Sequence, residues 1–319
     1  MAEQTDRPIY RELRSRPGRP SGSAWGLWGE DDEVGALNQL TPDAVVAAAR
    51  LVRRGAVFPL NWRLEVPDPG LFGRGPLEHV KRDDGFGMDD HFNRFFPHGS
   101  THWDSFGHFS HPEHGYYGGR TSEQLKGPNA RNSIAAWARR GVAGRFLLAD
   151  VERWRRETGR PIAQGSSEAV DITDVTGTLA AQGLEPQLGD ILLVRLGWIE
   201  WYTGLDAEGR AALASGPPWR FTAPGLSPAD ATVEWLWDSG IVAVAADCPA
   251  LEAFPFPPRG QSLHGTLLPL LGINLGEMFD LDALAADCAA DSTYVGLFTS
   301  APMNFVGATG SPANALAMK

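Results

Sequence analysis

Apolar runs of strand length alternate with helical segments along most of this chain, and this alternation constrains its fold more than any other feature. The clearest run is ILLVRLGW at residues 191–198, which follows the turn residues Gly189 and Asp190. Further apolar runs stand at residues 144–150, 241–247 and 294–300. Continuous apolar strands are typical of a sheet that is buried on both faces. The sequence therefore predicts an α/β fold.

Helix signals separate these runs. Thr41 is a suitable N-cap and Pro42 suits the first helical position, so we expect a helix over residues 42–52. Three more helices are expected, at residues 132–140, 172–181 and 227–237, whereas residues 64–97 are rich in turn signals. No change in composition marks a domain boundary. We expect one domain over residues 24–319, preceded by a polar, irregular arm over residues 1–23.

Charge and cysteine content limit the classes of partner. The chain has 28 basic and 39 acidic residues and a formal net charge of −11, so we expect no nucleic-acid partner. No stretch reaches the roughly 18 apolar residues of a membrane-spanning helix. The N-terminal segment lacks the apolar run of a secretory signal, and Cys248 and Cys288 form no pattern of a disulfide framework. These features predict a cytoplasmic protein with a small-molecule substrate and no membrane partner.

The segment that carries chemistry is rich in histidine. Five of the eight histidines lie between residues 98 and 114. Residues 98–108 read HGSTHWDSFGH and contain four candidate metal ligands, namely His98, His102, Asp104 and His108. Imidazole and carboxylate together suit zinc, manganese or iron(II), and the absence of a CxxC pair argues against a thiolate site.

The spacing of these ligands requires a bent backbone. His102 and Asp104 are two residues apart, so an extended strand places both on one face. A straight strand would separate His98 from His108 by roughly 33 Å, at about 3.3 Å per residue. Ligands of one site must lie far closer than that. The segment must therefore bend, and Gly99 and Gly107 are the positions where bending costs least.

A cluster of histidines with ordinary hydrogen bonds is the alternative to a metal site. Buried polar groups need partners, and one metal ion satisfies several of them together, so this density of ligands favours a metal. His111 and His114 lie in the Pro/Gly-rich stretch HPEHGYYGG and are expected in a loop. His79 and His91 show no partner pattern and receive no role.

The histidine segment resembles the signature His-x-Gly-Thr-His-x-Asp-x-Pro-x-His of the cyclase family of metal-dependent hydrolases, which includes bacterial kynurenine formamidase and isatin hydrolase. The matching residues are His98, Thr101, His102, Asp104 and His108. Ser100 stands in place of the glycine and Phe106 in place of the proline. The run GDILLVRLGW resembles the family's central strand, and GATGSP near the C-terminus resembles its closing motif.

The resemblance implies a swivelling β/β/α fold and a homodimer or homotetramer. It also implies hydrolysis of an amide or lactam C–N bond, with one or two divalent ions, zinc or manganese. The two departures flank the metal ligands, so they bear on the identity of the substrate more than on metal binding.

The resemblance also pairs His264 with Glu277 as a second ligand-bearing segment. The intervening residues fit an out-and-back path, because a helix over 265–271 is about 10 Å long and a strand over 273–277 spans about 16 Å. Glu277 is then a general base or a ligand to a second metal, with His264 as its partner. Asp104 can bridge two ions, which in two-metal sites lie about 3.5–4 Å apart.

A hydrolytic mechanism gives the remaining residues roles. A divalent metal lowers the pKa of bound water and polarises a carbonyl, and a neighbouring base takes a proton. His108 is the best base within the motif, and the resemblance also allows it to be a ligand to a second metal. Aromatic residues surround the ligands in sequence, which indicates a pocket for a flat or apolar substrate; they are Trp103, Phe106, Phe95 and Phe96.

Two other functions fit the same residue types. Two histidines and one carboxylate also form the facial triad of iron(II) oxygenases, but their second histidine usually lies far downstream of the His-x-Asp pair. A non-catalytic metal-binding protein would need a closed site, whereas a catalytic site keeps one position open. No GxSxG motif supports a serine nucleophile.

Overall fold

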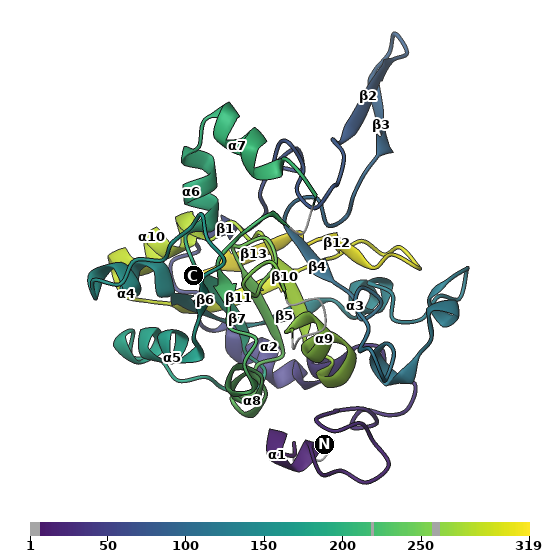
Figure 1. Ribbon diagram of the computed structural model, residues 1–319, viewed down its shortest axis with the longest axis vertical. Coiled ribbons are helices and arrows are strands. Elements are labelled where there is room, and N and C mark those ends of the chain that lie inside the picture. Colours follow the sequence, from purple (N-terminus) through teal and green to yellow (C-terminus); the bar gives the residue numbers. More distant parts are fainter. Residues whose placement is uncertain (1–6, 218–219, 257–261) are drawn as a thin grey trace.

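The computed structural model describes residues 7–217, 220–256 and 262–319, and its centre is a curled, mixed β-sheet (Figure 1). In the described residues this sheet has nine strands, in the spatial order β1 (Val57–Pro59), β13 (Ala315–Met318), β11 (Val295–Ser300), β5 (Val142–Asp150), β7 (Ile191–Arg195), β9 (Ala243–Ala246), β10 (Asn274–Glu277), β4 (His102–Asp104) and β12 (Gly310–Pro312). Strands β5, β7, β9 and β10 are parallel to one another, and all other pairings are antiparallel.

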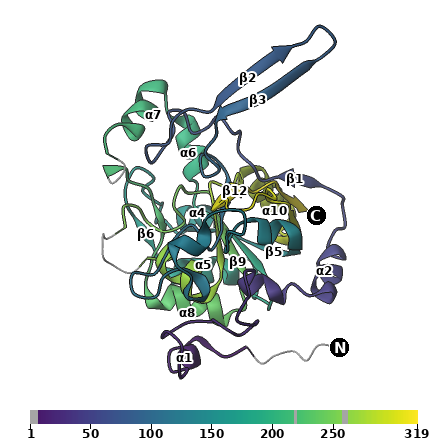
Figure 2. The same cartoon turned by 90° about the vertical axis from the view of Figure 1, so that its right-hand side faces the viewer.

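Helices cover this sheet and the surrounding loops. The α-helices are α1 (Tyr10–Leu13), α2 (Pro42–Ala49), α3 (Ala135–Arg140), α4 (Val151–Glu157), α5 (Ile172–Ala181), α6 (Trp198–Gly204), α7 (Ala207–Ala214), α8 (Asp230–Asp238), α9 (His264–Thr266) and α10 (Asp282–Asp291). Shorter helical turns are η1 (Gly35–Gln39), η2 (Tyr117–Gly119), η3 (Ser122–Leu125) and the π-helical η5 (Leu267–Leu271). Helix α2 packs against β5 and β11, whereas α4 packs against β7 and α5 against β5. In Figure 2, α2 and α5 lie on opposite sides of the central strands.

Local signals in the sequence explain where several elements begin. The hydroxyl of Thr41 accepts a hydrogen bond from the backbone N–H of Ala44 at 3.2 Å, and Pro42 opens α2. The carboxylate of Asp171 caps α5 in the same way through Thr173. Strands β7 and β9 are buried throughout, as continuous apolar runs require. The predicted α/β fold with one sheet at its centre is confirmed.

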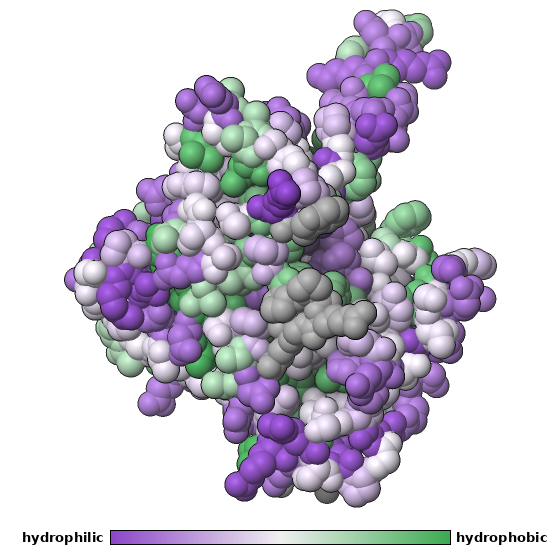
Figure 3. All heavy atoms as spheres, viewed as in Figure 1, coloured by the Kyte–Doolittle hydropathy of each residue, from purple (hydrophilic) through white to green (hydrophobic). Residues whose placement is uncertain are grey.

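The turn-rich region before the histidine segment contains a hairpin, which the turn signals of residues 64–97 do not predict. Strands β2 (Glu78–Asp83) and β3 (Met88–Arg94) pair only with each other and project from the body (Figures 1 and 2). Their surface is largely hydrophilic (Figure 3), although Phe86, Met88 and Phe92 are exposed on it. Two further short strands, β6 (Ala169–Val170) and β8 (Gly225–Leu226), form a separate parallel pair.

The N-terminal segment lies against the body over its described residues. Leu13 is fully buried, and the backbone N–H of Tyr10 donates to Asp238 at 2.6 Å. The indole of Trp237 donates to the carbonyl of Pro8 at 2.8 Å. These contacts fasten α1 to α8. Within the described residues, no helix is both long and apolar enough to cross a membrane.

A buried arginine organises the carboxyl ends of the central strands. Arg195, at the end of β7, is 6% exposed and forms ion pairs with four carboxylates, which belong to Asp150, Glu152, Glu200 and Asp282. Burial lowers the pKa of Arg195, but the negative charges of Asp247, Asp150 and Asp282 outweigh it and raise the pKa. The guanidinium therefore holds β5, β7 and the entrance of α10 together.

We expect Arg195→Met to lower the free energy of unfolding by about 3–5 kcal/mol, because it leaves several partly buried carboxylates without a counter-charge. The measurement is denaturant unfolding followed by circular dichroism. The control is Arg156→Met, which removes an exposed helical pair with Glu152 and should change the free energy by about 0.5 kcal/mol or less. Equal effects of the two substitutions would contradict this role for Arg195.

Candidate metal centre

Two residues of the centre owe their position to the strand β4. His102 and Asp104 are two residues apart on this strand, so both side chains lie on the same face. Both side chains are fully buried. The Nε2 atom of His102 lies 3.5 Å from Oδ1 of Asp104. His98 precedes the strand and folds back, so that its Nε2 lies 3.4 Å from the same oxygen. The bend in the histidine segment that the spacing required is present.

The neighbouring strand β10 brings Glu277 to this face. Glu277 lies directly opposite His102 in the antiparallel pairing, and the two side chains approach to 3.2 Å. His264, at the start of α9, places its Nε2 3.0 Å from Glu277 and 3.3 Å from Asp104. The structure thus places His264 and Glu277, which the resemblance paired, beside the ligands of the histidine segment. Asp104 lies at the centre, within 4.0 Å of four imidazoles.

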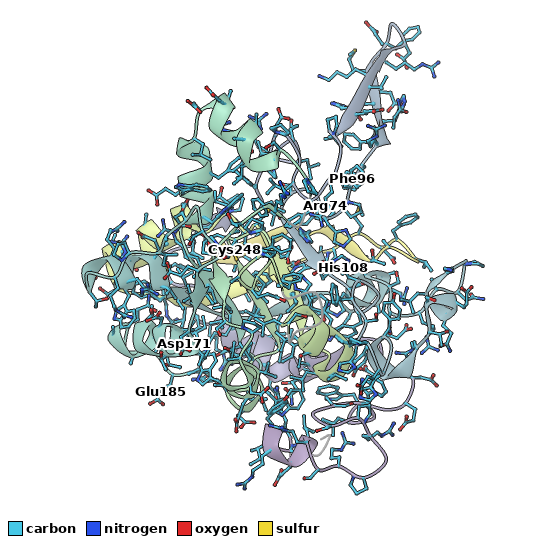
Figure 4. All side chains as sticks on the ribbon, viewed as in Figure 1. Arg74, Phe96, His108, Asp171, Glu185 and Cys248 are labelled. Carbon is cyan, nitrogen blue, oxygen red and sulfur yellow. The ribbon has the colours of Figure 1, made fainter. Side chains whose placement is uncertain are left out.

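His108 borders the open side of the cluster. Its Nε2 is 3.8 Å from Asp104, and its side chain is 27% exposed. The ring stacks on that of His98, with 4.3 Å between the ring centres. His111 and His114 stack on each other in the following loop, as expected for loop residues. Figure 4 shows His108 below Arg74 near the middle of the molecule.

Backbone and carboxylate acceptors orient two of the imidazoles. The Nδ1 atom of His102 lies 2.7 Å from the carbonyl oxygen of Ser100, and Nδ1 of His264 lies 2.8 Å from Oε2 of Glu252. The other oxygen of Glu252 accepts the backbone N–H of His264 at 3.2 Å. When Nδ1 carries the donated proton, Nε2 is left with its lone pair facing the centre.

Glu252 was not predicted. It is buried, and it follows β9 in the loop that leads toward His264. A carboxylate within the apolar run CPALEAF was the available signal, since a buried glutamate requires a partner.

The charges of the centre depend on one another. Burial lowers the pKa of His98 to about 3, and the neighbouring His102 adds to this effect. For His102, burial acts in the same direction, but the close carboxylates of Asp104 and Glu277 outweigh it and raise the pKa to about 9. Burial raises the pKa of Glu277, yet its contacts with His102 and His264 bring it below the usual range. The pKa of Asp104 is likewise below its usual range, because neighbouring imidazoles outweigh the effect of burial. The carboxylates of Asp104 and Glu277 are therefore ionised and need positive charge beside them.

The polar atoms at the centre fit a metal ion. Among the described residues, five buried ligand atoms have no hydrogen-bond partner, namely Nε2 of His98, Nε2 of His102, both carboxylate oxygens of Asp104 and Oε1 of Glu277. Such atoms are costly to bury unless a cation satisfies them. Two groups have ligand atoms close enough to share an ion: His98, Asp104 and His108, and His102, Asp104 and Glu277. Asp104 belongs to both groups, as a bridging carboxylate would.

A glycine makes room for this arrangement. Gly310, in strand β12, lies directly opposite Asp104 on β4, and a Cβ atom built there would overlap the imidazole of His98. Gly310 belongs to the motif GATGSP near the C-terminus. Because this glycine has no side chain, the imidazole of His98 has space beside Asp104. The carbonyl of His98 is held from the other side by the guanidinium of Arg74.

The four aromatic residues predicted to bind substrate have different surroundings. Trp103 lies on the opposite face of β4, is fully buried against Trp137, and donates to Ser300 at 3.1 Å. Phe106 is also buried, with its ring 4.6 Å from that of Tyr117. Trp103 alternates with His102 and Asp104 along β4, so it points away from the ligands. Phe106 lies beyond the strand and is 1% exposed. Both side chains belong to the hydrophobic core, and this position does not favour direct contact with a substrate.

Phe95 and Phe96 lie at the base of the hairpin. They line a cavity together with Arg74 and Gly99. A different cavity opens on the ligands themselves, and we call it the site cavity. It has a volume of about 430 Å³, part of it open to solvent. Its lining includes His108, His264 and Glu277, and a wall of four phenylalanines, Phe72, Phe109, Phe254 and Phe256.

The sheet and the cluster together define the class of protein: an α/β chain with a buried imidazole–carboxylate centre that opens on one side to an aromatic cavity. Residues 36–253 match the family model Cyclase, and this chain belongs to the cyclase family. The crystal structure of a novel cyclase is 31% identical, covers 93% of this chain and 99% of its own, and superposes with a TM-score of 0.82. The resemblance inferred from the motifs, and the fold that it implied, are confirmed.

More distant structures share the fold. Isatin hydrolase A from Ralstonia solanacearum is 17% identical over 88% of this chain and 98% of its own, with a TM-score of 0.57. An isatin hydrolase bound to the product analogue thioisatinate is 17% identical over 82% of this chain and 91% of its own, with a TM-score of 0.54. No curated protein matches the chain.

Substitution of the ligands tests the metal centre. His98→Ala and His102→Ala should each weaken metal binding by at least about 100-fold, since changes even to groups behind the ligands cost 10–100-fold. Asp104→Ala should have the largest effect, because Asp104 belongs to both groups. Elemental analysis of the purified variants measures the loss. His79→Ala, in the exposed hairpin, is the control. Stoichiometric metal in all three ligand variants would disprove the assignment.

The space beside His98 is tested by Gly310→Ala. The added methyl group should displace the imidazole and lower the metal affinity by about 10-fold or more, in the range seen when groups that orient ligands are changed. The matched control is Gly204→Ala at the end of α6, where a Cβ atom meets nothing within 4 Å. Titration with zinc or manganese measures the affinity. An unchanged affinity in Gly310→Ala would show that His98 does not need this space.

Proposed function

We propose that this protein is a metal-dependent hydrolase that cleaves an amide or lactam C–N bond of a small, aromatic substrate. The observation that carries the proposal is the convergence of buried ligand atoms without hydrogen-bond partners beside a cavity that stays open. Catalytic metal sites keep one position free for water or substrate, whereas structural sites are closed. The ions that suit the imidazole and carboxylate ligands are zinc and manganese.

The residues of the chain have distinct tasks in this proposal. His98, His102, Asp104, His264 and Glu277 are the ligands for one or two ions. A bound divalent ion lowers the pKa of a water molecule and polarises the carbonyl under attack. His108 accepts a proton from the attacking water and returns it to the leaving nitrogen.

Exposure and protonation support this role for His108. It is the most exposed imidazole of the cluster, and its ring lines the site cavity. Burial lowers its pKa against the opposing effect of Asp104, so that the ring is neutral at pH 7 and free to accept a proton. The four phenylalanines of the cavity favour a flat or apolar group next to the scissile bond.

Two alternative functions, an iron(II) oxygenase and a non-catalytic metal-binding protein, are distinguished by the substrate screen described below. An iron(II) oxygenase needs only two histidines and one carboxylate, whereas this centre adds Glu277 and His264 around a shared Asp104. A closed, non-catalytic metal site does not require an aromatic cavity beside its ligands.

A substrate screen tests the proposal. The protein loaded with zinc or manganese should hydrolyse at least one N-formyl amide or lactam, and a chelator should abolish this activity until metal is restored. His108→Gln should lower kcat by roughly 100-fold or more while the metal remains bound, since a general base contributes about 10²–10⁴-fold. His114→Gln in the neighbouring loop is the matched control.

Each other result has a defined meaning. Cleavage of lactones alone would contradict the C–N specificity, and turnover that requires oxygen would indicate an oxygenase. Loss of one metal equivalent from His108→Gln would make His108 a ligand instead of a base. Tightly bound metal with no turnover of any class would favour a non-catalytic protein.

A further inference from the structure

Arg74 is a cation beside the metal centre that has no carboxylate of its own. It lies in the loop before β2, where its guanidinium donates one hydrogen bond to the carbonyl of His98. In the described part of the chain, no carboxylate approaches it within 4.0 Å. Arg195, by contrast, contacts four carboxylates at 2.5–3.1 Å. Arg74 is partly buried, and even partial burial of a guanidinium without a counter-charge is costly, so its position here calls for a function.

Two cavities meet at Arg74. It lines the site cavity together with His108 and Glu277, and it lines the neighbouring cavity at the base of the hairpin together with Phe96. Figure 4 shows it between the labelled Phe96 and His108. A ligand that enters the site cavity therefore meets a positive charge next to the metal ligands.

The surroundings of the guanidinium are aromatic. Its carbon lies 5.0 Å from the centre of the Phe72 ring, and that ring packs edge-on against Phe254 at 5.1 Å. Phe256 continues the wall, with its ring 5.0 Å from Phe254 and 5.3 Å from His264. An arginine held against aromatic rings presents its planar edge, and that edge matches the two oxygens of a carboxylate.

The two carboxylates whose charges affect Arg74 are also candidate metal ligands. Glu277 and Asp104 oppose the lowering of its pKa by burial, but both belong to the candidate metal centre. A guanidinium has five N–H donors, and the carbonyl of His98 uses one nitrogen. The remaining donors are available to a ligand.

We propose that Arg74 binds a carboxylate of the substrate, so that the substrate class is an aromatic amide or lactam that carries an acidic group. This inference rests on the proposed hydrolase function. The carboxylate pairs with Arg74, the aromatic ring packs against Phe72, Phe254 and Phe256, and the scissile carbonyl faces His108 and the ligands.

Binding of two simple probes tests the proposal without turnover. Benzoate and benzamide have the same shape, and only benzoate is charged. The metal-loaded protein should bind benzoate roughly 10- to 100-fold more tightly, as expected for hydrogen bonds to a charged group. In Arg74→Gln, which keeps an N–H donor for the carbonyl of His98 but has no charge, the preference should fall below about threefold. Isothermal titration calorimetry and elemental analysis give the affinities and the metal content.

A matched control and a second assay separate the outcomes. Arg63→Gln removes an exposed arginine that pairs with Glu65 at 3.6 Å, and it should keep the wild-type preference. Hydrolysis of N-formylanthranilate and of its neutral carboxamide should show the same dependence on Arg74 in kcat/KM. Failure of both compounds to react, with benzoate still bound through Arg74, would count against the hydrolase function and leave the anion site standing.

Three results would overturn the proposal. Equal affinity of the wild-type protein for both probes would show that no anion site exists. An unchanged benzoate preference in Arg74→Gln would show that the carboxylate binds to the metal instead. Loss of metal from Arg74→Gln would make Arg74 a residue that positions His98.

Discussion

The structure of this centre depends on one buried carboxylate. Asp104 is fully buried, neither of its side-chain oxygens has a hydrogen-bond partner in the described protein, and four imidazoles surround it. A lone carboxylate in such a position would be too costly to keep ionised, so the groups around it must supply positive charge. This requirement explains why the histidine segment, His264 of α9 and Glu277 of β10 converge there. It also explains the buried carboxylate of Glu252, which supports the charge of His264 from behind.

The geometry of three adjacent strands turns this requirement into a site. Strand β4 lies between β10 and β12, and its period of two places His102 and Asp104 on the same face. The residues paired with His102 and Asp104 on the two neighbouring strands differ in what they add to the site. Glu277 adds a carboxylate opposite His102, whereas Gly310 adds no side chain opposite Asp104 and so leaves space for His98. A cavity wall of phenylalanines then covers the side from which a substrate must arrive.

The sequence predicted those parts of the molecule whose signals are local. Helix α5 has the predicted bounds because Asp171 caps it, and the density of ligands in residues 98–108 was enough to indicate a metal centre. The hairpin of β2 and β3 was missed because both of its faces are exposed, so no apolar alternation marks it. Trp103 was assigned to the pocket because it is next to the ligands in sequence, although a strand sends adjacent residues to opposite faces. The contributions of Glu252 and Arg74 depend on contacts across the fold, which no local pattern reveals.

The register of β4 also governs when the centre can form. Glu277 lies 175 residues beyond its partner His102, and Gly310 lies 206 residues beyond its partner Asp104, so the contacts that close the site are among those of long sequence separation. Such contacts form late, because the entropy of closing a long loop must be overcome before they stabilise anything. During synthesis, the histidine segment emerges well before the strands that complete its surroundings. A chain must therefore be made at least as far as Glu277 before it holds all of its candidate ligands, and as far as Gly310 before β12 can pair with β4 beside them.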